Sequence, residues 1–433
     1  MITFLGFAMV ACFMGLIMTK RLTPLVALII VPVAFGLFAG QAAGLGPMML
    51  DGIAKLAPTG VMLMFAILYF GLMTDCGLFD PMVQRLVHLV HADPVRISLG
   101  TVALCALVSL DGDGSTTYVI TTAALLPLYR CMNMSRLKLA CLLMLTSGVM
   151  NITPWGGPTA RAASALALDP RDVFVPMIPA MIGAVLFLFG VAYVFGLAER
   201  RRLSGQMVVE SAESLVQLCI SQNAGSRREN MFWFNLLLTF ALLVLLVWGI
   251  LPLPILMMLA FAIAMIANYP NLNEQKLRVA AHAPNVLAVV SLIFAAGIFT
   301  GILQGTGMVE AMSRGIVQAI PPALGPYMAP ITAALSLPFT FFISNDAFYF
   351  GVVPVLAEAG GHYGIAPIDI ARASLVGQPF HLLSPLVPST YLLVTLAGVE
   401  LGDHQKFALK WALATCAVLV LVAMATLAFP LVG

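Results

Sequence analysis

The chain has 433 residues, of which 61% are hydrophobic and only 9% are charged, and its mean hydropathy is +1.02. Because soluble domains carry about 25% charged residues, this composition excludes a soluble globular protein and indicates a polytopic helical membrane protein. The net charge of +2 does not indicate a nucleic-acid partner, and the seven cysteines form no CxxC pair that would indicate a metal-thiolate or disulfide framework.

Apolar runs divide the sequence into two halves of similar layout. In the first half they cover 2–18, 23–40, 58–78, 97–129, 138–168 and 173–197, and a charged linker follows at 198–230. In the second half they cover 231–249, 251–267, 284–308, 323–360, 369–397 and 407–431. We expect five crossings and one re-entrant hairpin in each half, with hairpins at 97–129 and 323–360. The first arm of the first hairpin, 98–110, is shorter than the about 20 residues that a crossing helix needs.

Each predicted hairpin carries a polar tip, which hydrocarbon tolerates only where it faces a cavity or an ion. The first tip is Ser109–Thr117 (SLDGDGSTT), in which two glycines allow the turn. The second tip reads Ser344-Asn345-Asp346. A surface loop between two short helices is the alternative, but the matched positions in the two halves favour hairpins that enter the membrane.

Two predicted crossings contain proline and glycine near their middle. The run 138–168 includes Asn151–Arg161 (NITPWGGPTAR), and the run 369–397 includes Gly377–Thr390 (GQPFHLLSPLVPST). Proline removes a backbone donor and kinks or breaks a helix, and broken helices line the binding sites of many transporters. We therefore expect both crossings to be unwound at a binding site.

Four landmarks recur at nearly one offset, which indicates an internal duplication. The offsets are 232 for Asp113 and Asn345, 231 for Pro154 and Pro385, 230 for Gly77-x-x-Asp80 and Gly307-x-x-Glu310, and 229 for Ile2 and Met231. With five crossings in each copy, the second copy enters the membrane from the opposite side. The sequence thus predicts inverted repeats at 1–197 and 231–433, joined by the linker 198–230.

The basic residues predict the orientation in a bacterial inner (plasma) membrane. Sixteen of the 21 Lys and Arg residues fall on one predicted side, four fall on the other, and Arg161 lies within the membrane. Because cytoplasmic loops are rich in Lys and Arg, the linker is predicted to be cytoplasmic and both termini are predicted outside.

The two tips and two breaks together predict a site for an anion that carries positive charge with it. Hydroxyls, amides and helix N-termini suit a carboxylate, whereas aspartates suit a cation. The candidate substrate-binding residues are Ser115, Thr116, Thr117, Asn151, Thr153, Gly156, Thr159, Arg161, Ser344, Asn345, Ser384, Pro385, Ser389 and Thr390. The candidates for cation or proton coupling are Asp111, Asp113, Asp346 and His381, with Asp113 and Asp346 as candidate metal ligands.

Two of these residues have alternative roles. Arg161 either binds the substrate or pairs with an aspartate such as Asp113, because an unpaired arginine in a membrane has a high free-energy cost. His381 either titrates near neutral pH or is a neutral histidine bonded to a backbone carbonyl, and we favour the second role. The other histidines, with no metal-site spacing, are predicted in loops: His88, His91, His282, His362 and His404.

Enzyme motifs are missing from the sequence. It contains no HExxH motif, and Gly112-Asp113-Gly114-Ser115 does not match the Gly-x-Ser-x-Gly elbow of serine hydrolases. Asp111 and Asp113 sit on one tip, whereas the dyad of an aspartyl protease faces inward from two sides. We therefore predict that the chain is not an enzyme.

Over essentially its whole length the chain resembles the citrate–divalent metal:proton symporter family of the ion transporter superfamily. The resemblance is carried by Ser109–Ile120 (SLDGDGSTTYVI), Asn151–Ala163 (NITPWGGPTARAA), Ser344–Val355 (SNDAFYFGVVPV) and Gly377–Phe407, which includes SPLVPSTYLL and GVELGDHQKF. It implies proton-driven uptake of citrate in complex with a divalent cation of the Mg or Ca type, and no permanently bound cofactor. It also implies the all-α fold of the related sodium–dicarboxylate symporters, a homodimer with a scaffold domain and a transport domain that moves as an elevator.

The tips depart from the pattern of those symporters, in which a Ser-Asn-Thr motif at each tip contacts the substrate carboxylate. Here the second tip reads Ser344-Asn345-Asp346 and the first contains Asp113-Gly114-Ser115-Thr116. The additional negative charge fits a metal-bearing substrate or a proton and puts sodium coupling in doubt. A sodium-coupled di- or tricarboxylate symporter and a passive anion channel are the alternative functions.

Overall fold

The computed structural model describes residues 2–19, 21–78, 81, 93–112, 114–203, 231–319 and 321–433. Every regular element within these residues is a helix, which confirms the all-α prediction. Asp113, His88, His91 and residues 204–230 of the predicted linker lie outside the described residues.

The helices of the first half follow the predicted order. They are α1 (Ile2–Met18), α2 (Pro24–Phe38), α3 (Leu45–Asp75), α5 (Pro94–Val108), the 3-10 turn η1 (Ser109–Asp111), α6 (Gly114–Cys131), α7 (Arg136–Met150), α8 (Gly157–Ala165), α9 (Pro170–Phe174), η2 (Val175–Met177) and α10 (Ile178–Leu203).

The second half repeats this order. Its elements are α12 (Phe232–Trp248), α13 (Leu253–Asn268), α14 (Leu272–Gly305), α15 (Met308–Ala319), η4 (Pro322–Tyr327), α16 (Met328–Phe342), the π-helix η5 (Ala347–Val352), α17 (Val353–Gly361), α18 (Pro367–Leu375), α19 (Gln378–His381), α20 (Pro388–Ala397) and α21 (Leu401–Ala425). Within the described residues, five helical segments are long and apolar enough to cross a membrane, among them α3, α14 and α21.

Two helices are longer than predicted. α3 begins at Leu45 rather than at 58, and α14 begins at Leu272 rather than at 284. The prediction left these N-terminal stretches, which contain charged residues, outside the apolar runs. Oppositely charged side chains one turn apart can pair within a helix, so the stretches are helical. In α3, Lys55 Nζ lies 2.7 Å from Asp51 Oδ2. The prediction of His282 in a loop was therefore wrong, because this residue lies inside α14.

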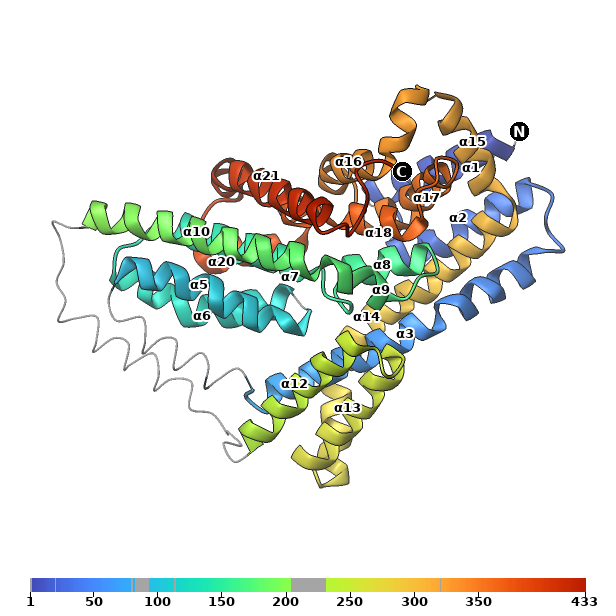
Figure 1. Cartoon of the computed structure of the whole chain (residues 1–433). Coiled ribbons are helices and arrows are strands. Elements are labelled where there is room, and N and C mark those ends of the chain that lie inside the picture. Colours follow the sequence, from blue (N-terminus) through green and yellow to red (C-terminus); the bar gives the residue numbers. More distant parts are fainter. Residues whose placement is uncertain are drawn as a thin grey trace.

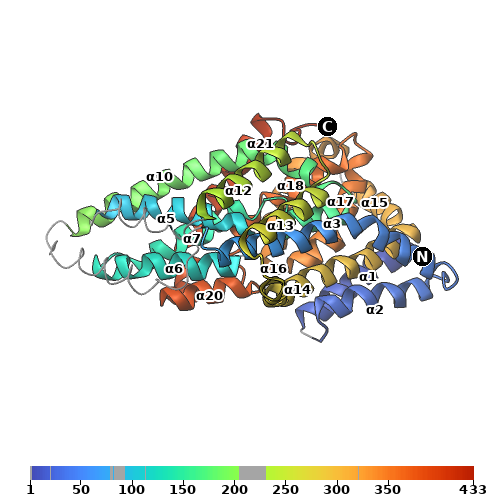
Figure 2. The ribbon, with the colours of Figure 1, turned by 90° about the horizontal axis from the view of Figure 1, so that it is seen from below.

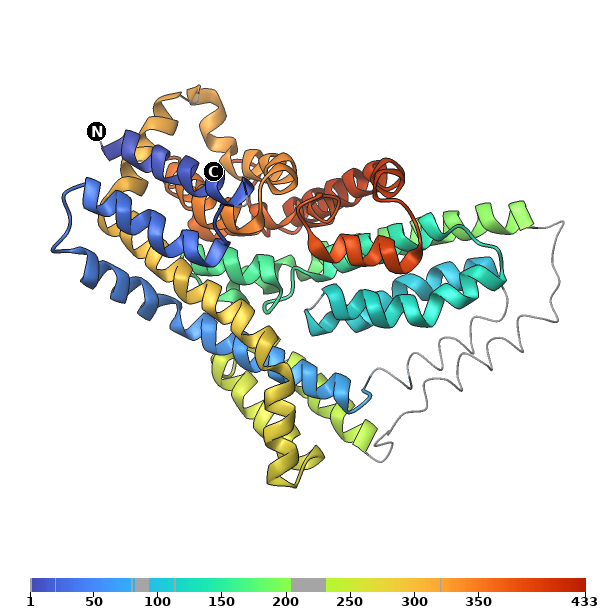
Figure 3. The same ribbon diagram turned by 180° about the vertical axis from the view of Figure 1, so that it is seen from behind.

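α3 and α14 lie side by side and pack against each other (Figures 1 and 3). Their backbones approach closely where glycines face each other. A Cβ on Gly52 would collide with the carbonyl oxygen of Gly297 and would lie 2.9 Å from the Cα of Gly301. Small residues at a helix crossing allow this close contact, which gives membrane helices their dispersion energy. α13 also packs on α3, and α2 packs on α14.

The first predicted hairpin is formed by α5, η1 and α6, and α5 and α6 lie side by side (Figure 1). The chain reverses at Gly112, whose φ of +77° favours glycine and where a Cβ would come within 2.7 Å of the Trp155 ring. The argument from length was wrong, because Pro94–Asp111 alone is 18 residues long and apolar enough to cross. The turn, and not the length of the arm, therefore defines this hairpin.

The helices are interrupted within the two stretches that contain proline and glycine. Residues 151–156 separate α7 from α8, and residues 382–387 separate α19 from α20. A threonine at the start of each following helix bonds back across its break. Thr159 Oγ1 donates to the Ile152 carbonyl at 2.8 Å, and Thr390 Oγ1 donates to the Leu382 carbonyl at 2.6 Å. These bonds satisfy carbonyls that the unwinding releases.

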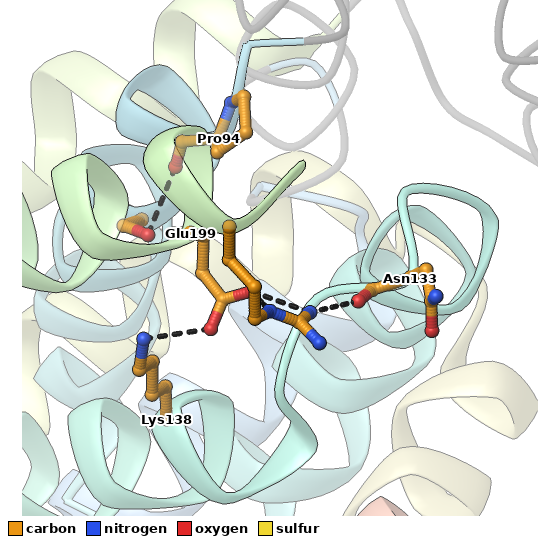
Figure 4. A network of polar contacts seen from close by, with 6 residues as sticks. Pro94, Asn133, Lys138 and Glu199 are labelled. Atoms are coloured by element: carbon orange, nitrogen blue, oxygen red, sulfur yellow. Dashed lines mark hydrogen bonds and ion pairs between the residues drawn. The ribbon is translucent and has the colours of Figure 1, made fainter. Parts of the chain in front are cut away.

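α10 continues to Leu203, so the first six residues of the predicted linker are helical. Glu199 is only 1% exposed there, and two cations compensate its charge (Figure 4). Lys138 Nζ lies 2.6 Å from Oε1, and Arg202 Nη2 lies 2.7 Å from Oε2. Arg202 also donates to the Asn133 carbonyl, which ties the end of α10 to the turn before α7. A buried carboxylate is tolerated when cations pair with it in this way.

The two termini lie toward the same end of the molecule, away from the end of α10 at Leu203 (Figures 1 and 2).

Candidate functional site

A cavity of about 510 Å³ lies where the first hairpin tip and the first break face α3 and α14. One wall comes from the tip, the break and α8, and the opposite wall comes from α3 and α14. The lining residues are Asp111, Gly112, Ser115, Thr116, Trp155, Gly157 and Arg161 on the first wall, and Ala66, Ile67, Phe70, Gly71, Thr74, His282, Asn285, Ala288 and Val289 on the second.

The first wall is held together by contacts between the tip and the break. Trp155 Nε1 donates to the Leu110 carbonyl at 2.9 Å, and the Trp155 ring packs against Phe70 with ring centroids 4.9 Å apart. Thr117 Oγ1 donates to Asp111 Oδ1 at 3.4 Å. Four predicted site residues therefore line one cavity: Asp111, Ser115, Thr116 and Arg161.

Arg161 joins the first break to the second tip. Its Nε donates to Asp346 Oδ1 at 2.6 Å, and the two side chains are 23% and 12% exposed. The pairing alternative is therefore present in this structure, with Asp346 as a partner among the described residues. The guanidinium also lines the cavity, so pairing with Asp346 does not remove it from a substrate.

The first tip in turn meets the second break. A Cβ built on Gly114 would lie 3.7 Å from Ser389 Oγ, and α6 packs against α20. The first tip thus lies beside the start of α20, directly after the second break, and Arg161 on α8 contacts the second tip.

The remaining polar residues of the second break bond to backbone atoms. Ser384 Oγ donates to the Phe341 carbonyl at 2.6 Å, and His381 Nδ1 lies 2.5 Å from the Thr340 carbonyl oxygen. The contact with a backbone carbonyl that belongs to the second of the two roles considered for His381 is therefore present, and the role itself stays a prediction. His381 and Ser384 thus connect the second break to the end of α16.

The other predicted residues lie at element ends near the tips and breaks. Asn151 caps the end of α7, Gly156 precedes α8, and Pro385 lies within the second break. Ser344 Oγ accepts a hydrogen bond from the Ala347 amide at 3.2 Å at the start of η5. Asp113 is outside the described residues.

Two predicted binding residues have buried polar atoms without hydrogen-bond partners among the described residues: Thr153 Oγ1 and Asn345 Oδ1. Native proteins leave few such atoms, so each requires an explanation such as a ligand or water. The described residues contain no cluster of three His, Cys, Asp or Glu side chains that would hold a metal.

The sequence reasoning missed the second wall. His282, Asn285 and Val289 are spaced as neighbours on one helix face, but the predicted start of the crossing at 284 placed His282 in a loop. The spacing of the two polar residues at the edge of an apolar run was the available signal.

Known proteins of similar sequence are transporters. A sequence model of the citrate transporter family (CitMHS) matches residues 13–377. A Bacillus subtilis citrate transporter is 56% identical, with 98% of each chain covered. The Mg(2+)/citrate complex secondary transporter of the same organism is 51% identical over 99% of this chain and 98% of its own. These relatives confirm the prediction that the chain is not an enzyme.

Solved structures share the fold at low sequence identity. The Neisseria gonorrhoeae efflux pump MtrF is 15% identical with a TM-score of 0.63, over 90% of this chain and 85% of its own. The Alcanivorax borkumensis transporter YdaH is 16% identical with a TM-score of 0.56, over 91% and 90%. The family match and the two curated relatives carry the assignment: this chain belongs to the citrate transporter family, CitMHS, as its motifs predicted.

Proposed function

We propose that the chain is a secondary active transporter that takes up citrate in complex with a divalent metal ion, coupled to protons. The observation that carries this proposal is the cavity in which Asp111, two tip hydroxyls and Arg161 face one space. Carboxylate and hydroxyl oxygens suit Mg²⁺ or Ca²⁺, and a guanidinium suits a carboxylate. The 51% identity to a Mg(2+)/citrate complex transporter supports the same substrate.

The two unpartnered atoms support a ligand at the meeting point of tips and breaks. Thr153 Oγ1 lies in the first break, and Asn345 Oδ1 lies on the second tip. A buried hydroxyl or amide oxygen without a partner loses its solvation, which costs about 1–3 kcal/mol. Both residues lie outside the lining of the cavity, so a ligand would reach these atoms only after the tips and breaks rearrange.

The helix order supports inverted repeats. α3 and α14 end at Asp75 and Gly305, an offset of 230, and α7 and α18 begin at Arg136 and Pro367, an offset of 231. We propose that 1–197 and 231–433 are inverted copies, that the linker is cytoplasmic and that both termini are outside. We further propose a homodimer in which the tips and breaks move together as an elevator past α3 and α14.

Uptake of labelled citrate into proteoliposomes tests the proposal. We expect uptake with magnesium or calcium and a loss of uptake with a chelator, because the complex is the proposed cargo. Accumulation above the outside concentration, driven by an inward proton gradient, is expected of a proton symporter. If uptake stops when potassium replaces sodium at a constant pH gradient, the sodium-coupled alternative is favoured. Purely downhill flux would favour a channel.

A further inference from the structure

The second wall of the cavity contains an imidazole that no predicted site included. His282 on α14 lines the cavity beside Asn285, opposite the tip that carries Asp111 and Ser115. The first wall supplies oxygen atoms that suit a metal ion. A bound metal–tricarboxylate complex also presents carboxylate oxygens that the metal does not hold, and these need hydrogen-bond donors on another side of the site.

His282 is held in place from two sides. Its Nε2 lies 3.0 Å from Asp75 Oδ2 at the end of α3, and the same oxygen accepts from Arg278 Nη1 at 3.2 Å. The His282 side chain is 18% exposed. Gly71 provides the space for the ring, because a Cβ at this position would come within 2.6 Å of Nδ1. Gly71 and His282 both line the cavity, so the ring lies at its wall.

The contact with Asp75 uses one ring nitrogen and leaves the other for an occupant of the cavity. In its charged form the imidazole keeps Nε2–H for Asp75 and donates Nδ1–H, and hydrogen bonds to charged groups are the strong ones. Asp75 on α3 contacts the ring and pairs with Arg278 on α14, and the other charged residues that line the cavity are Asp111 on η1 and Arg161 on α8.

We propose that His282 contacts a carboxylate of the anion that the metal does not hold, and that Asp75 is its positioning residue. This inference rests on the proposed function, since it takes a metal-bound polycarboxylate as the ligand. It assigns the α3–α14 wall to substrate recognition and orients the complex with its metal toward the first tip.

Two substitutions separate contact with the substrate from a structural role. The amide of Gln reaches the position of Nε2, and the amide of Asn reaches the position of Nδ1. His282→Gln therefore keeps the Asp75 contact and loses the group that faces the cavity, whereas His282→Asn does the reverse. For substrate contact we expect His282→Gln to weaken magnesium citrate binding about tenfold or more and His282→Asn to weaken it less. If His282 only ties α3 to α14, the order of the two variants reverses.

Calorimetric titration of the purified protein with magnesium citrate measures these dissociation constants, and the thermal midpoint reports folding. His362→Gln in the exposed turn after α17 is the matched control. Wild-type affinity in His282→Gln, or a larger loss in His282→Asn, overturns the inference. Failure of the wild type to bind magnesium citrate instead overturns the proposed function.

A second pair of variants decides the question if both histidine variants fail to fold. Gly71→Ala displaces the ring without touching Asp75, and Gly46→Ala on the same helix meets nothing within 4 Å. Equal binding in the two variants overturns the inference, because displacing the ring would then leave substrate affinity unchanged.

Discussion

At the scale of single residues, Arg161 has two possible roles. It forms an ion pair with Asp346, and it lines the cavity where it could bind substrate. Removing one partner of a buried pair leaves an uncompensated charge, which costs about 3–5 kcal/mol. Arg161→Gln and Asp346→Asn should each lower the thermal midpoint and stop citrate uptake. The double variant Arg161→Gln/Asp346→Asn should regain the midpoint but not uptake, if the arginine also binds substrate.

An exposed pair provides the control for this test. Lys55 and Asp51 also form an ion pair on one helix, but their side chains are 47% and 62% exposed, and such pairs contribute about 0–1 kcal/mol. Lys55→Gln should therefore leave both readouts near the wild-type values. Recovered uptake in the double variant would mean that Arg161 serves only to pair with Asp346.

Asp113 tests the coupling half of the proposal. It is one of two aspartates in the polar tip SLDGDGSTT, and an asparagine keeps the size of the side chain while removing its charge and its titration. Asp113→Asn should abolish proton-driven accumulation of citrate while expression and dimerisation stay intact. Asp403→Asn, an exposed position at the start of α21, is the matched control. Full accumulation by Asp113→Asn would exclude this carboxylate from coupling.

At the scale of helices, the crossing of α3 and α14 depends on glycine. A methyl group on Gly52 would collide with the backbone of Gly297, and backbone atoms cannot move aside as a flexible side chain can. Gly52→Ala should therefore destabilise the protein by about 1–3 kcal/mol, the usual cost of overpacking. The thermal midpoint in detergent measures this effect, with Gly46→Ala as the control on the same helix. Equal midpoints would mean that the two helices can separate at no cost.

The gaps between helices fall within the stretches where breaks were predicted, whereas the ends of the long helices differ from the prediction. Proline, glycine and polar residues inside apolar runs mark a turn or a break locally, so the breaks after Met150 and His381 fall within the predicted stretches. The starts of α3 and α14 and the end of α10 depend on charges whose partners lie in other turns or other helices. Glu199 is helical and buried because Lys138, far along the chain, neutralises it. For the same reason the partner of Arg161 and the wall that contains His282 could not be predicted from local sequence.

At the scale of the whole molecule, the two halves exchange contacts crosswise. Arg161 of the first half meets Asp346 of the second, and Gly114 of the first tip lies against Ser389 of the second break. Two copies inserted in opposite directions bring matching elements together near the middle of the membrane, where half-helix ends can face one ligand. The crosswise contacts thus agree with the proposed inverted repeats, and the side on which each terminus lies tests that topology directly.

Protease-cleavable tags at both ends of this chain report their sides in right-side-out membranes. The proposed five crossings per half would put the two ends on one side, and the excess of Lys and Arg in the opposite loops predicts that this side is outside. External protease should therefore remove both tags, while a tag in the linker 204–230 should be cut only after the membrane is permeabilised. Removal of one terminal tag alone would mean an odd number of crossings and would exclude two copies of five. Protection of both terminal tags with cleavage in the linker would reverse the orientation but keep the repeats.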